Sequence, residues 1–331
     1  MFRTAVLRSA RPAATTTTNR FYGTSAAKGY QGSNQWLTAA SMIVTSVGLG
    51  AYCLNKASTR TFADAATPPA AFSPEEFRAF KLEKKEPINH NTAVFRFKLP
   101  SDQHVSGLHV ASCVITRYPI KKKDGSTGYV IRPYTPTSRE ETQGYVEFVI
   151  KEYPQGKMSK HIHGLQPGDE LEIKGPIPKY NWEQGRVDNL GLIAGGTGIT
   201  PMLQLIRKIF SEGSTDKNTK VILIFANQTE DDILLRDELE SYAKSHPERF
   251  KIIYALDRPP EKWDGHQGFV TKELVAKHFP KPGTPSTLIA VCGPDPMLAS
   301  IAGEKAPDKS QGPLGGILKE LGYGQDNVYK F

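Results

Sequence analysis

The residues of this chain best suited to hold a ligand are three glycines within one short turn. Gly195, Gly196 and Gly198 follow the apolar run 190–194 and precede Pro201, after which apolar residues recur at helical spacing. Glycines let the backbone approach a bulky group, and free N–H groups at a helix start suit a phosphate or a polar ring edge. Pro201 is tolerated in the first helical position, where its missing N–H costs nothing. We therefore expect a nucleotide at this turn. The alternative is a tight turn without a ligand, because Pro201 replaces the last glycine of the usual dinucleotide pattern.

A second group of candidate residues stands where a strand would end, in the run Arg132-Pro133-Tyr134-Thr135-Pro136. Arg132 could pair with a phosphate, Tyr134 could stack on a flat ring, and Thr135 could hydrogen-bond the edge of that ring. A strand-ending turn with a surface arginine is the alternative interpretation.

A third group leads into a predicted helix, in the run Gly156-Lys157-Met158-Ser159. Ser159 could cap that helix, and the exposed N–H groups at its start could bind a pyrophosphate. His161 and His163 follow on the same helix without any further ligand pattern, so we predict a solvated pair and no metal site.

The cysteines exclude several kinds of redox site. Cys53, Cys113 and Cys292 are far apart, and no C-x-x-C pair occurs. They cannot form a disulfide framework, a zinc site or an iron–sulfur cluster, so any redox chemistry must come from a bound organic cofactor. Cys292 has no partner for nucleophilic catalysis, and a small buried residue at a strand end is its simpler interpretation.

Two patterns of hydrophobicity predict the domains that would position these residues. Residues 75–183 alternate in the β manner and predict an antiparallel β-barrel, closed or nearly closed, with one helix after Ser159. Residues 184–331 alternate between strand and helix and predict an α/β domain with an open parallel sheet. The expected barrel strands are 79–84, 93–99, 110–117, 129–133, 145–151 and 170–174. The expected strands of the second domain are 190–194, 221–226, 252–256 and 288–291, and its expected helices are 201–210, 231–245 and 272–278. Thr229 and Asp232 resemble a capping box for the second of these helices.

The N-terminal part has a different character. Residues 1–35 are rich in Arg, Ser, Thr and Ala without any acidic residue, which is typical of a mitochondrial targeting segment. Residues 36–54 are mostly apolar and close to the length that spans a bilayer, so we predict a transmembrane anchor. A cleaved sorting signal or an uncharged linker are the alternatives, and residues 55–74 read as a tether.

Charge is distributed unevenly along the chain. The formal net charge is +8, but residues 1–63 alone carry seven basic residues and no acidic one. The remainder is almost neutral, so a nucleic-acid partner is not implied.

Five blocks occur in an order that identifies a family. They are Arg-Pro-Tyr-Thr at 132–135, Ile-Lys-x-Tyr at 150–153, Gly-Lys-Met-Ser at 156–159, Gly-Gly-Thr-Gly-Ile-Thr-Pro-Met at 195–202, and Cys-Gly-Pro-x-Pro-Met at 292–297. Over residues 75–299 the chain resembles the ferredoxin-reductase-type flavoproteins, and among them the NADH–cytochrome b5 reductases. Together with the N-terminal part, it is similar to fungal mitochondrial members.

The resemblance implies two cofactor sites. Arg132 would bind the FAD pyrophosphate, and Pro133, Tyr134 and Thr135 complete the block that holds the flavin. Further FAD contacts would come from Val149, Lys151, Tyr153, Gly156, Lys157, Met158 and Ser159. The glycine turn, with Gly195, Gly196 and Gly198, leads to Thr200, which would join Thr135 beside the reacting rings. The nicotinamide end of NADH would lie against Cys292, Gly293, Pro294 and Met297. Asp257 matches an acidic position that favours NADH, because a carboxylate there accepts from ribose hydroxyls and repels a 2′-phosphate; an ordinary strand-end aspartate is the alternative.

The resemblance also implies an activity. A hydride would pass from NADH to FAD, and single electrons would then reach cytochrome b5. Lysines would meet the acidic haem edge of that partner, with Lys157 as the first candidate and Lys121, Lys122 and Lys123 as further ones, unless these three form only a solvated hairpin loop. The implied location is the mitochondrial outer membrane, with a processed intermembrane-space form as an alternative.

Two other functions stay open from the sequence. One is a reductase of the same fold that serves a quinone or an oxygenase. The other is a membrane-tethered nucleotide-binding module without catalysis, which would require flavin binding to be lost. The C-terminal part 299–330 is longer than the core of the resembled family requires. It contains an insert at 306–316 that is rich in Gly, Pro and Lys, and the sequence assigns this insert no role.

Overall fold

The computed structural model describes residues 67–331 of the chain. The predicted targeting segment, the predicted anchor and residues 55–66 of the predicted tether lie outside this range. At the far end of that tether, Ala71 and Phe72 are buried, and their N–H groups donate to the carbonyl groups of Val105 and Ser106. Among residues 67–331, no helix is long and apolar enough to cross a bilayer.

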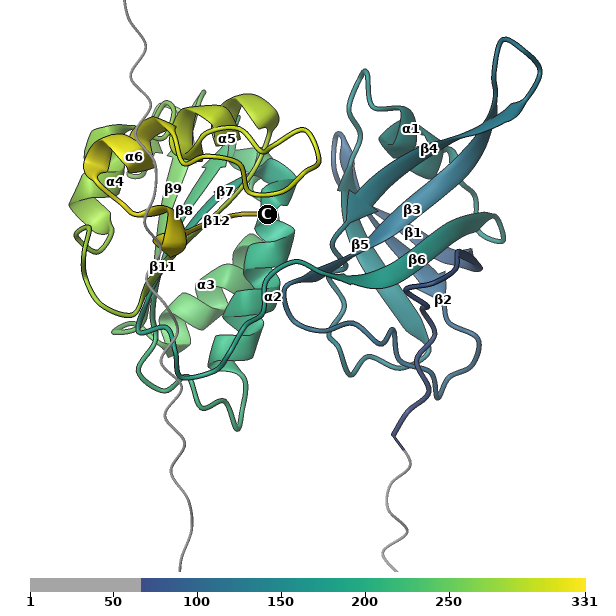
Figure 1. The fold of residues 1–331 in the computed structure, drawn as a ribbon, viewed down its shortest axis with the longest axis horizontal. Helices are drawn as coiled ribbons and strands as arrows, with labels where there is room; N and C mark the ends of the chain where they lie inside the picture. The colour runs from purple at the N-terminus through teal and green to yellow at the C-terminus, as the bar shows by residue number, and fades with distance from the viewer. Residues whose placement is uncertain (1–66) are drawn as a thin grey trace, which may run out of the picture. The chain divides into compact units, whose positions relative to one another are not determined.

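The first part of the described chain forms a six-stranded antiparallel sheet, which we call the antiparallel half (Figure 1). Its strand order is β4-β3-β6-β1-β2-β5, so β4 and β5 are edge strands, and no ladder of hydrogen bonds joins these two described strands. The strands are β1 (Arg78–Asn89), β2 (Thr92–Lys98), β3 (Ser112–Lys121), β4 (Thr127–Tyr134), β5 (Tyr145–Lys151) and β6 (Glu170–Pro178). All six overlap predicted strands, and β1, β3, β4 and β6 run further than predicted.

Large aromatic side chains fix the buried face of this sheet. Phe95 and Phe97 of β2 and Phe148 of β5 are at most 1% exposed. Phe95 stands directly opposite Phe148 in the β2–β5 ladder, and the rings of Phe97 and Phe148 meet edge to face with centroids 5.9 Å apart. Aromatic pairs of this geometry add stability beyond the area that they bury. The register of β5 is therefore well determined, and β5 delivers Lys151 to the edge of the sheet.

Helix α1 (Lys157–Gly164) begins two residues before Ser159, so the prediction that Ser159 caps this helix is wrong. Gly156 is the N-cap residue, and Ser159 lies within the first turn, where it is buried. Its Oγ accepts from the Tyr153 N–H at 3.1 Å and donates to the Gly156 carbonyl oxygen at 3.1 Å. Ser159 therefore fastens the start of the helix to the loop that precedes it.

The two histidines of α1 pack against aromatic rings, so the prediction of a solvated pair is also wrong. The His161 ring stacks on Tyr118 with centroids 3.9 Å apart, and burial lowers the pKa of His161. His163 lies edge to face with Phe95, and its Nε2 is 2.9 Å from the Ile150 carbonyl oxygen. Both rings serve to seat α1 on the sheet.

The second part of the described chain forms a parallel sheet, which we call the parallel half. Its strand order is β10-β9-β8-β7-β11-β12. The strands are β7 (Asn189–Gly195), β8 (Lys220–Asn227), β9 (Phe250–Leu256), β10 (His266–Gln267), β11 (Thr287–Cys292) and β12 (Val328–Lys330). The predicted order of an antiparallel sheet followed by a parallel one is confirmed. The edge strands β10 and β12 were not predicted, because two or three residues leave no readable periodicity.

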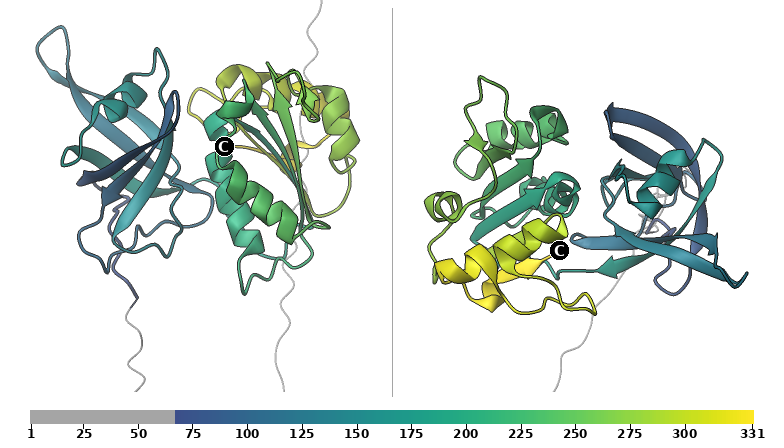
Figure 2. Two further views of the ribbon diagram at one scale, coloured as in Figure 1. Left: turned by 180° about the vertical axis from the view of Figure 1, so that it is seen from behind. Right: turned by 90° about the horizontal axis from the view of Figure 1, so that it is seen from above.

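Helices cover both faces of the parallel sheet (Figure 2). One face carries α2 (Ile199–Phe210) and α3 (Arg236–Ser245), and the other carries α4 (Lys272–His278), α5 (Asp295–Ala302) and α6 (Gly316–Leu321). Neighbouring residues of β7 show the alternation: Leu192 packs with the first group and Ile193 with the second, and both are fully buried. Strands buried on both faces read as continuous apolar runs, which is why the sequence revealed them.

Two helix predictions need correction. Helix α2 begins at Ile199, so Pro201 is its third residue and not its first. It still lies within the first turn, where a backbone N–H has no partner inside the helix. The predicted helix 231–245 is divided into the 3-10 turn η2 (Glu230–Asp232) and α3, because Leu235 between them adopts a left-handed φ of 57°. The predicted capping box belongs to η2: Asp232 Oδ2 accepts from the Thr229 N–H at 3.2 Å and from its hydroxyl at 2.8 Å.

The stretch 306–316 is fastened to the edge strand β12. Lys330 is only 2% exposed, and its ammonium donates to the carbonyl oxygens of Glu304 at 2.9 Å and Pro313 at 3.0 Å. The Gln311 side chain bonds the backbone N–H and carbonyl of Lys330 at 2.7 and 3.0 Å. These contacts give the stretch a structural role in closing this edge of the sheet.

Helix α4 offers a test of local stability. The Thr271 side chain accepts a hydrogen bond from the Leu274 N–H at 3.2 Å, as an N-cap residue should. We expect Thr271→Ala to lower the free energy of unfolding by about 1 kcal/mol, whereas Thr271→Ser should retain it. Thermal unfolding followed by circular dichroism would show this as a fall of about 2–4 °C. An unchanged midpoint for the alanine variant would mean that the cap contributes nothing.

Candidate functional site

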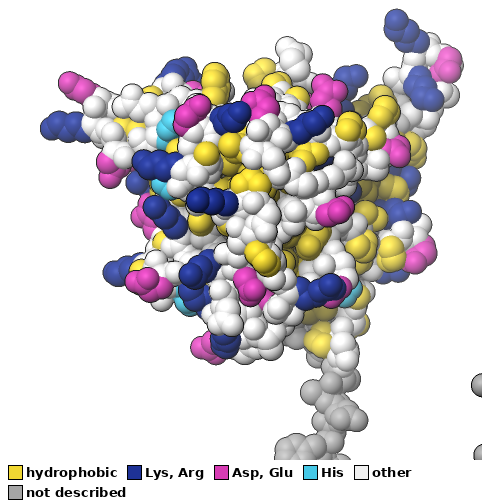
Figure 3. Space-filling view, turned by 60° about the vertical axis from the view of Figure 1, so that its left-hand side comes forward, with side chains coloured by type: hydrophobic (Ala, Val, Ile, Leu, Met, Phe, Trp, Pro, Cys, Tyr) yellow, Lys and Arg dark blue, Asp and Glu magenta, His cyan; other side chains and the backbone are white. Residues whose placement is uncertain are grey.

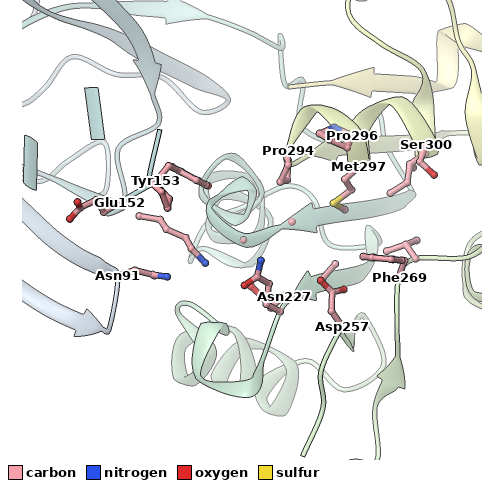
Figure 4. A pocket seen from close by; sticks show the side chains of 18 residues that line it. Asn91, Glu152, Tyr153, Asn227, Asp257, Phe269, Pro294, Pro296, Met297 and Ser300 are labelled. Atoms are coloured by element: carbon pink, nitrogen blue, oxygen red, sulfur yellow. The ribbon is translucent and has the colours of Figure 1, made fainter. Parts of the chain in front are cut away.

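A cavity of about 670 Å3 opens where the two halves meet. The antiparallel half contributes the turn after β1 and the segment that follows β5. The parallel half contributes the carboxyl ends of β7, β8 and β9 and the start of α5. Figure 4 shows Asn91 and Tyr153 on one side of it and Asp257, Phe269 and Met297 on the other. Ligands of open α/β sheets bind at the carboxyl ends of the strands, so this is the expected place for a nucleotide.

The glycine turn is required by close packing at the end of β7. A Cβ on Gly198 would lie 2.2 Å from the Cys292 carbonyl oxygen, and one on Gly195 would lie 2.4 Å from the Met297 sulfur. Gly196 adopts a left-handed φ of 52° and lies in the cavity wall. The turn therefore brings the end of β7 against the residues that follow β11. This contact brings together two blocks that lie about a hundred residues apart in the sequence.

The threonines of this turn point in different directions. Thr200 is buried, and its hydroxyl donates to the Thr197 carbonyl oxygen at 3.1 Å. The Thr197 hydroxyl lies 3.3 Å from the Tyr153 hydroxyl, which belongs to the antiparallel half. Thr200 is thus placed at the start of α2 with its hydroxyl directed inward, and its predicted place beside the reacting rings stays a prediction.

The block 132–135 lies at the end of β4, as predicted. Arg132 is exposed and donates to the Ile131 carbonyl oxygen at 2.7 Å, and no acidic partner pairs with it among the described ion pairs. Burial, with the neighbouring Tyr153 as a second cause, raises the pKa of Tyr134 to about 12. Thr135 is half-buried and directly follows the strand. An unpaired cation beside a partly buried phenol suits a ligand that has both phosphate groups and a flat ring.

The start of α1 also fits a phosphate group. A Cβ on Gly156 would lie 2.3 Å from Ser159 Oγ and 3.0 Å from Tyr153 Cβ, so only glycine fits there. The first turn carries no acidic residue, and Lys157 is exposed at its start. Met158 is 2% exposed and anchors the turn in the core. Backbone N–H groups at such a helix start attract an anion, so these residues fit the pyrophosphate of a dinucleotide such as FAD.

Two residues predicted to line FAD have other contacts. Val149 is buried and packs in the hydrophobic core on the side of α2 and α3. Lys151 forms an ion pair across the two halves, with its ammonium 3.0 Å from Asp232 Oδ1, and both side chains are largely buried. This pair and its Thr229 hydrogen bonds lower the pKa of Asp232 against the opposing effect of burial. Lys151 also lines the cavity. Its ion pair with Asp232 therefore links the two halves at the cavity wall.

Asp257 and Phe269 form the far side of the cavity (Figure 4). Asp257 directly follows β9 and is exposed, and partial burial of its carboxyl raises its pKa while Arg258 opposes that shift. Phe269 is 77% exposed, which is unusual for a large apolar side chain. An exposed ring beside a carboxylate suits a nucleoside, with the ring stacking on the base and the carboxylate accepting from ribose hydroxyls. Phe269 was missed because no motif surrounds it.

The block that follows β11 lies directly over the glycine turn. Met297 of α5 has its sulfur near Gly195 and Gly293, and Pro294 is the N-cap residue of α5 in the cavity wall. Burial raises the pKa of the Cys292 thiol to about 12, so it stays protonated near neutral pH. A protonated thiol is a poor nucleophile. The block can therefore shape a binding surface, and covalent chemistry at Cys292 is disfavoured.

Comparison with known families matches both halves. The oxidoreductase FAD-binding domain family matches residues 79–182, and the oxidoreductase NAD-binding domain family matches residues 192–303. The antiparallel half thus corresponds to a FAD-binding domain and the parallel half to a NAD-binding domain. The glycine at the start of α1 and the glycine turn after β7 lie in the first and second of these matches.

Individual relatives narrow the family. NADH-cytochrome b5 reductase 2 of Botryotinia fuckeliana is 51% identical over 257 residues, which are 77% of this chain and 72% of the relative. The protein of the same name from Aspergillus niger is 43% identical over 94% of this chain and 95% of the relative. Among solved structures, the cytochrome b5 reductase domain of Ulva prolifera nitrate reductase is 33% identical with a TM-score of 0.67, and the match covers 79% of this chain and 99% of that domain. This chain belongs to the NADH–cytochrome b5 reductase family, whose FAD-binding and NAD-binding domains its two sheets provide.

Proposed function

We propose that this protein is a NADH–cytochrome b5 reductase, in which NADH reduces a bound FAD and the flavin then passes single electrons to cytochrome b5. The observation that carries the proposal is the cavity at the meeting of the two halves, because residues of the FAD-binding and NAD-binding family matches both line it. In this proposal the antiparallel sheet curves into a nearly closed barrel that holds FAD. Relatives of that name support the choice of electron donor and acceptor.

The chain's own residues would bind and align the two ring systems. FAD, when bound, accepts a hydride and releases electrons one at a time, which no side chain can do. Arg132 and the start of α1 would bind its pyrophosphate, and Tyr134 with Thr135 would orient its ring. Asp257 and Phe269 would bind the nucleoside of NADH, and the Met297 block would seat the nicotinamide. Alignment of two reactants in this way removes much of the entropic cost of their encounter, so no acid–base pair is needed.

Surface lysines would guide the acceptor. Lys157 is exposed at the start of α1, and Lys121, Lys122 and Lys123 are exposed at the hairpin between β3 and β4. On the face drawn in Figure 3, basic and acidic side chains are interspersed without a broad patch of one sign. A small basic group near the flavin would therefore steer an acidic haem edge by local charge, which accelerates encounter and weakens with added salt.

We further propose a membrane location for the protein. The uncharged apolar run 36–54, preceded by basic residues, would act as a single anchor in the mitochondrial outer membrane, and residues 55–74 would link it to the described part. Imaging of a C-terminally tagged full-length protein, followed by alkaline extraction of mitochondria, tests this. Release of all the protein into the alkaline supernatant would contradict anchoring.

An anaerobic absorbance titration of the full-length protein tests the proposed activity. NADH should bleach the flavin absorbance far more readily than NADPH, and oxidised cytochrome b5 added next should become reduced. A protein purified with added FAD that binds no flavin would contradict the proposal at its first step. Flavin bleaching without haem reduction would instead point to a same-fold reductase with a different acceptor.

Asp257→Ala is expected to weaken the preference for NADH. Loss of the carboxylate removes hydrogen bonds to the ribose and removes repulsion of a 2′-phosphate, so the ratio of kcat/KM for NADH to that for NADPH should fall about 10- to 100-fold. Because the pKa of Asp257 is raised, its carboxylate is protonated at a higher pH than that of an ordinary aspartate. On acidification the parent protein should therefore lose its preference for NADH at a correspondingly higher pH. Steady-state kinetics with both nucleotides at two pH values measures the change, and Asp264→Ala provides a control for an acidic residue outside the cavity lining. An unaltered ratio would contradict the role of Asp257.

A further inference from the structure

One side chain of the cavity is buried without any hydrogen-bond partner. Asn227, the last residue of β8, is 6% exposed, and neither its amide nitrogen nor its amide oxygen has a partner. Among residues 67–331, only four buried side-chain atoms lack a partner, and Asn227 supplies two of them. Buried polar groups are nearly always paired, so a carboxamide with both ends free calls for an explanation.

The polar groups of the segments around Asn227 make hydrogen bonds to other partners and none to its amide. The Asp232 carboxylate accepts from Thr229 and from Lys151. The Gln228 side-chain oxygen accepts from Arg258 at 3.2 Å. Asn227 lines the cavity beside these groups, and Figure 4 shows its amide directed into the space between Asn91 and Asp257. No described group bonds the amide nitrogen or the amide oxygen of Asn227, so both are left for a ligand in the cavity.

The strand order indicates which part of a ligand lies there. Strands β9, β8, β7 and β11 are neighbours in that order, so Asp257, Asn227, Gly195 and Cys292 follow one another along the carboxyl edge of the sheet. Neighbouring strands are about 4.8 Å apart, so this row is comparable in length to an extended dinucleotide. With the adenosine ribose at Asp257 and the nicotinamide beyond Gly195, the part of NADH above β8 is the pyrophosphate and the ribose next to it.

We propose that Asn227 binds the middle of NADH, with its amide N–H donating to a pyrophosphate oxygen and its amide oxygen accepting from a ribose hydroxyl. This inference rests on the proposed function, since it assumes that a dinucleotide occupies the cavity. Lys151, which lines the same part of the cavity, brings a positive charge to the same group of the ligand. Without a ligand, the unpaired amide of Asn227 destabilises the folded protein locally. Binding of NADH would supply the missing hydrogen bonds and remove this cost.

The proposal predicts effects of opposite sign from a single substitution. Asn227→Leu replaces an unpaired amide by an apolar group of similar size, so the free protein should melt about 2–5 °C higher. The same change should weaken binding of NAD+ and of ADP-ribose about 10- to 100-fold, because both contain the pyrophosphate. Binding of AMP, which lacks it, should change less than threefold. A merely structural asparagine would instead give a lower melting temperature and unchanged affinity.

Calorimetric titration of the full-length, flavin-loaded protein with NAD+, ADP-ribose and AMP measures these affinities without turnover. Asn189→Leu is the matched control, because Asn189 begins β7 at the opposite end of the sheet and donates to Pro285. Asn227→Asp is the second variant. It keeps the size of the side chain but adds a negative charge, so it should weaken binding of ADP-ribose more than binding of AMP. A parent that binds no NAD+ would refute the proposed function. If the parent protein binds NAD+ and both Asn227 variants bind ADP-ribose as tightly as the parent does, the role of Asn227 is overturned while the proposed function stands.

Discussion

Gly198→Ala should reduce the rate of flavin reduction by NADH about 100-fold or more, although it adds only one methyl group. That methyl carbon would lie 2.2 Å from the Cys292 carbonyl oxygen, 2.6 Å from its carbonyl carbon and 3.0 Å from the Gly293 nitrogen. All three are backbone atoms, so no side-chain rotation can make room. The end of β7 would have to move away from the residues that follow β11. These two segments hold neighbouring parts of the proposed site, and a displacement of about 1 Å can cost 100-fold in rate.

The expected stability cost of this variant is about 1–3 kcal/mol, which is typical of overpacking in a core. Stopped-flow absorbance measures flavin reduction, and thermal unfolding measures stability in the same preparation. Gly213→Ala is the matched control: Gly213 has a left-handed φ of 76°, a Cβ there would meet nothing within 4 Å, and it does not line the cavity. It should cost about 1 kcal/mol of backbone strain and much less in rate. Equal rates in the two alanine variants would show that close packing at Gly198 is unimportant.

The sequence predicted both sheets because their patterns are strong. The antiparallel strands alternate around Phe95, Phe97 and Phe148, and the parallel strands are continuous apolar runs buried on both faces. The glycine turn could be predicted as well, since it lies between two such readable elements. The structure adds its reason, which is the contact with Cys292 and Met297.

The two helix boundaries that were predicted wrongly have local causes that a hydrophobic pattern does not record. The break at Leu235 lies within a pattern that a continuous helix would also produce, so the hydrophobic spacing could not reveal it. Ser159 carries the side chain of an N-cap residue, yet its hydroxyl bonds the backbone at Tyr153 and Gly156. The preference of serine for N-cap positions identified a helix start, but it placed the N-cap residue three positions too late, at Ser159 and not at Gly156. Propensity is a weak guide wherever a loop can offer the same hydrogen bonds.

In the candidate site, too, some residues could be predicted from the sequence and others could not. Residues within motifs, such as Arg132 and Asp257, were predicted from the chain alone, and the structure places them at strand ends. Asn227, Asp232 and Phe269 were missed as site residues because their significance depends on burial, pairing and exposure. An asparagine at a strand end is ordinary in a sequence. It becomes informative only when both ends of its amide are seen to be unpaired.

Arg132→Met should weaken FAD binding about 100-fold or more, and the purified variant should lose most of its yellow colour. Two other arginines of the same sheet already have acidic partners: Arg96 of β2 pairs with Glu147 at 2.7 Å, and Arg117 of β3 pairs with Glu172 at 2.8 Å. Arg132 has only a backbone contact, so its guanidinium is available to a phosphate. Removal of one partner of a charge-assisted pair typically costs about 2–5 kcal/mol.

Two further variants separate charge from geometry in this prediction. Arg132→Lys keeps the charge but loses the two-pronged guanidinium, so it should recover only part of the FAD affinity. Arg117→Met removes an arginine from the adjacent strand β3 and should keep FAD affinity within about threefold, because Arg117 is already bound to Glu172. The quenching of FAD fluorescence on titration into the flavin-free protein gives the dissociation constants. If Arg132→Met binds FAD as tightly as Arg117→Met does, the pyrophosphate of FAD is held elsewhere, and the start of α1 becomes the site to mutate next.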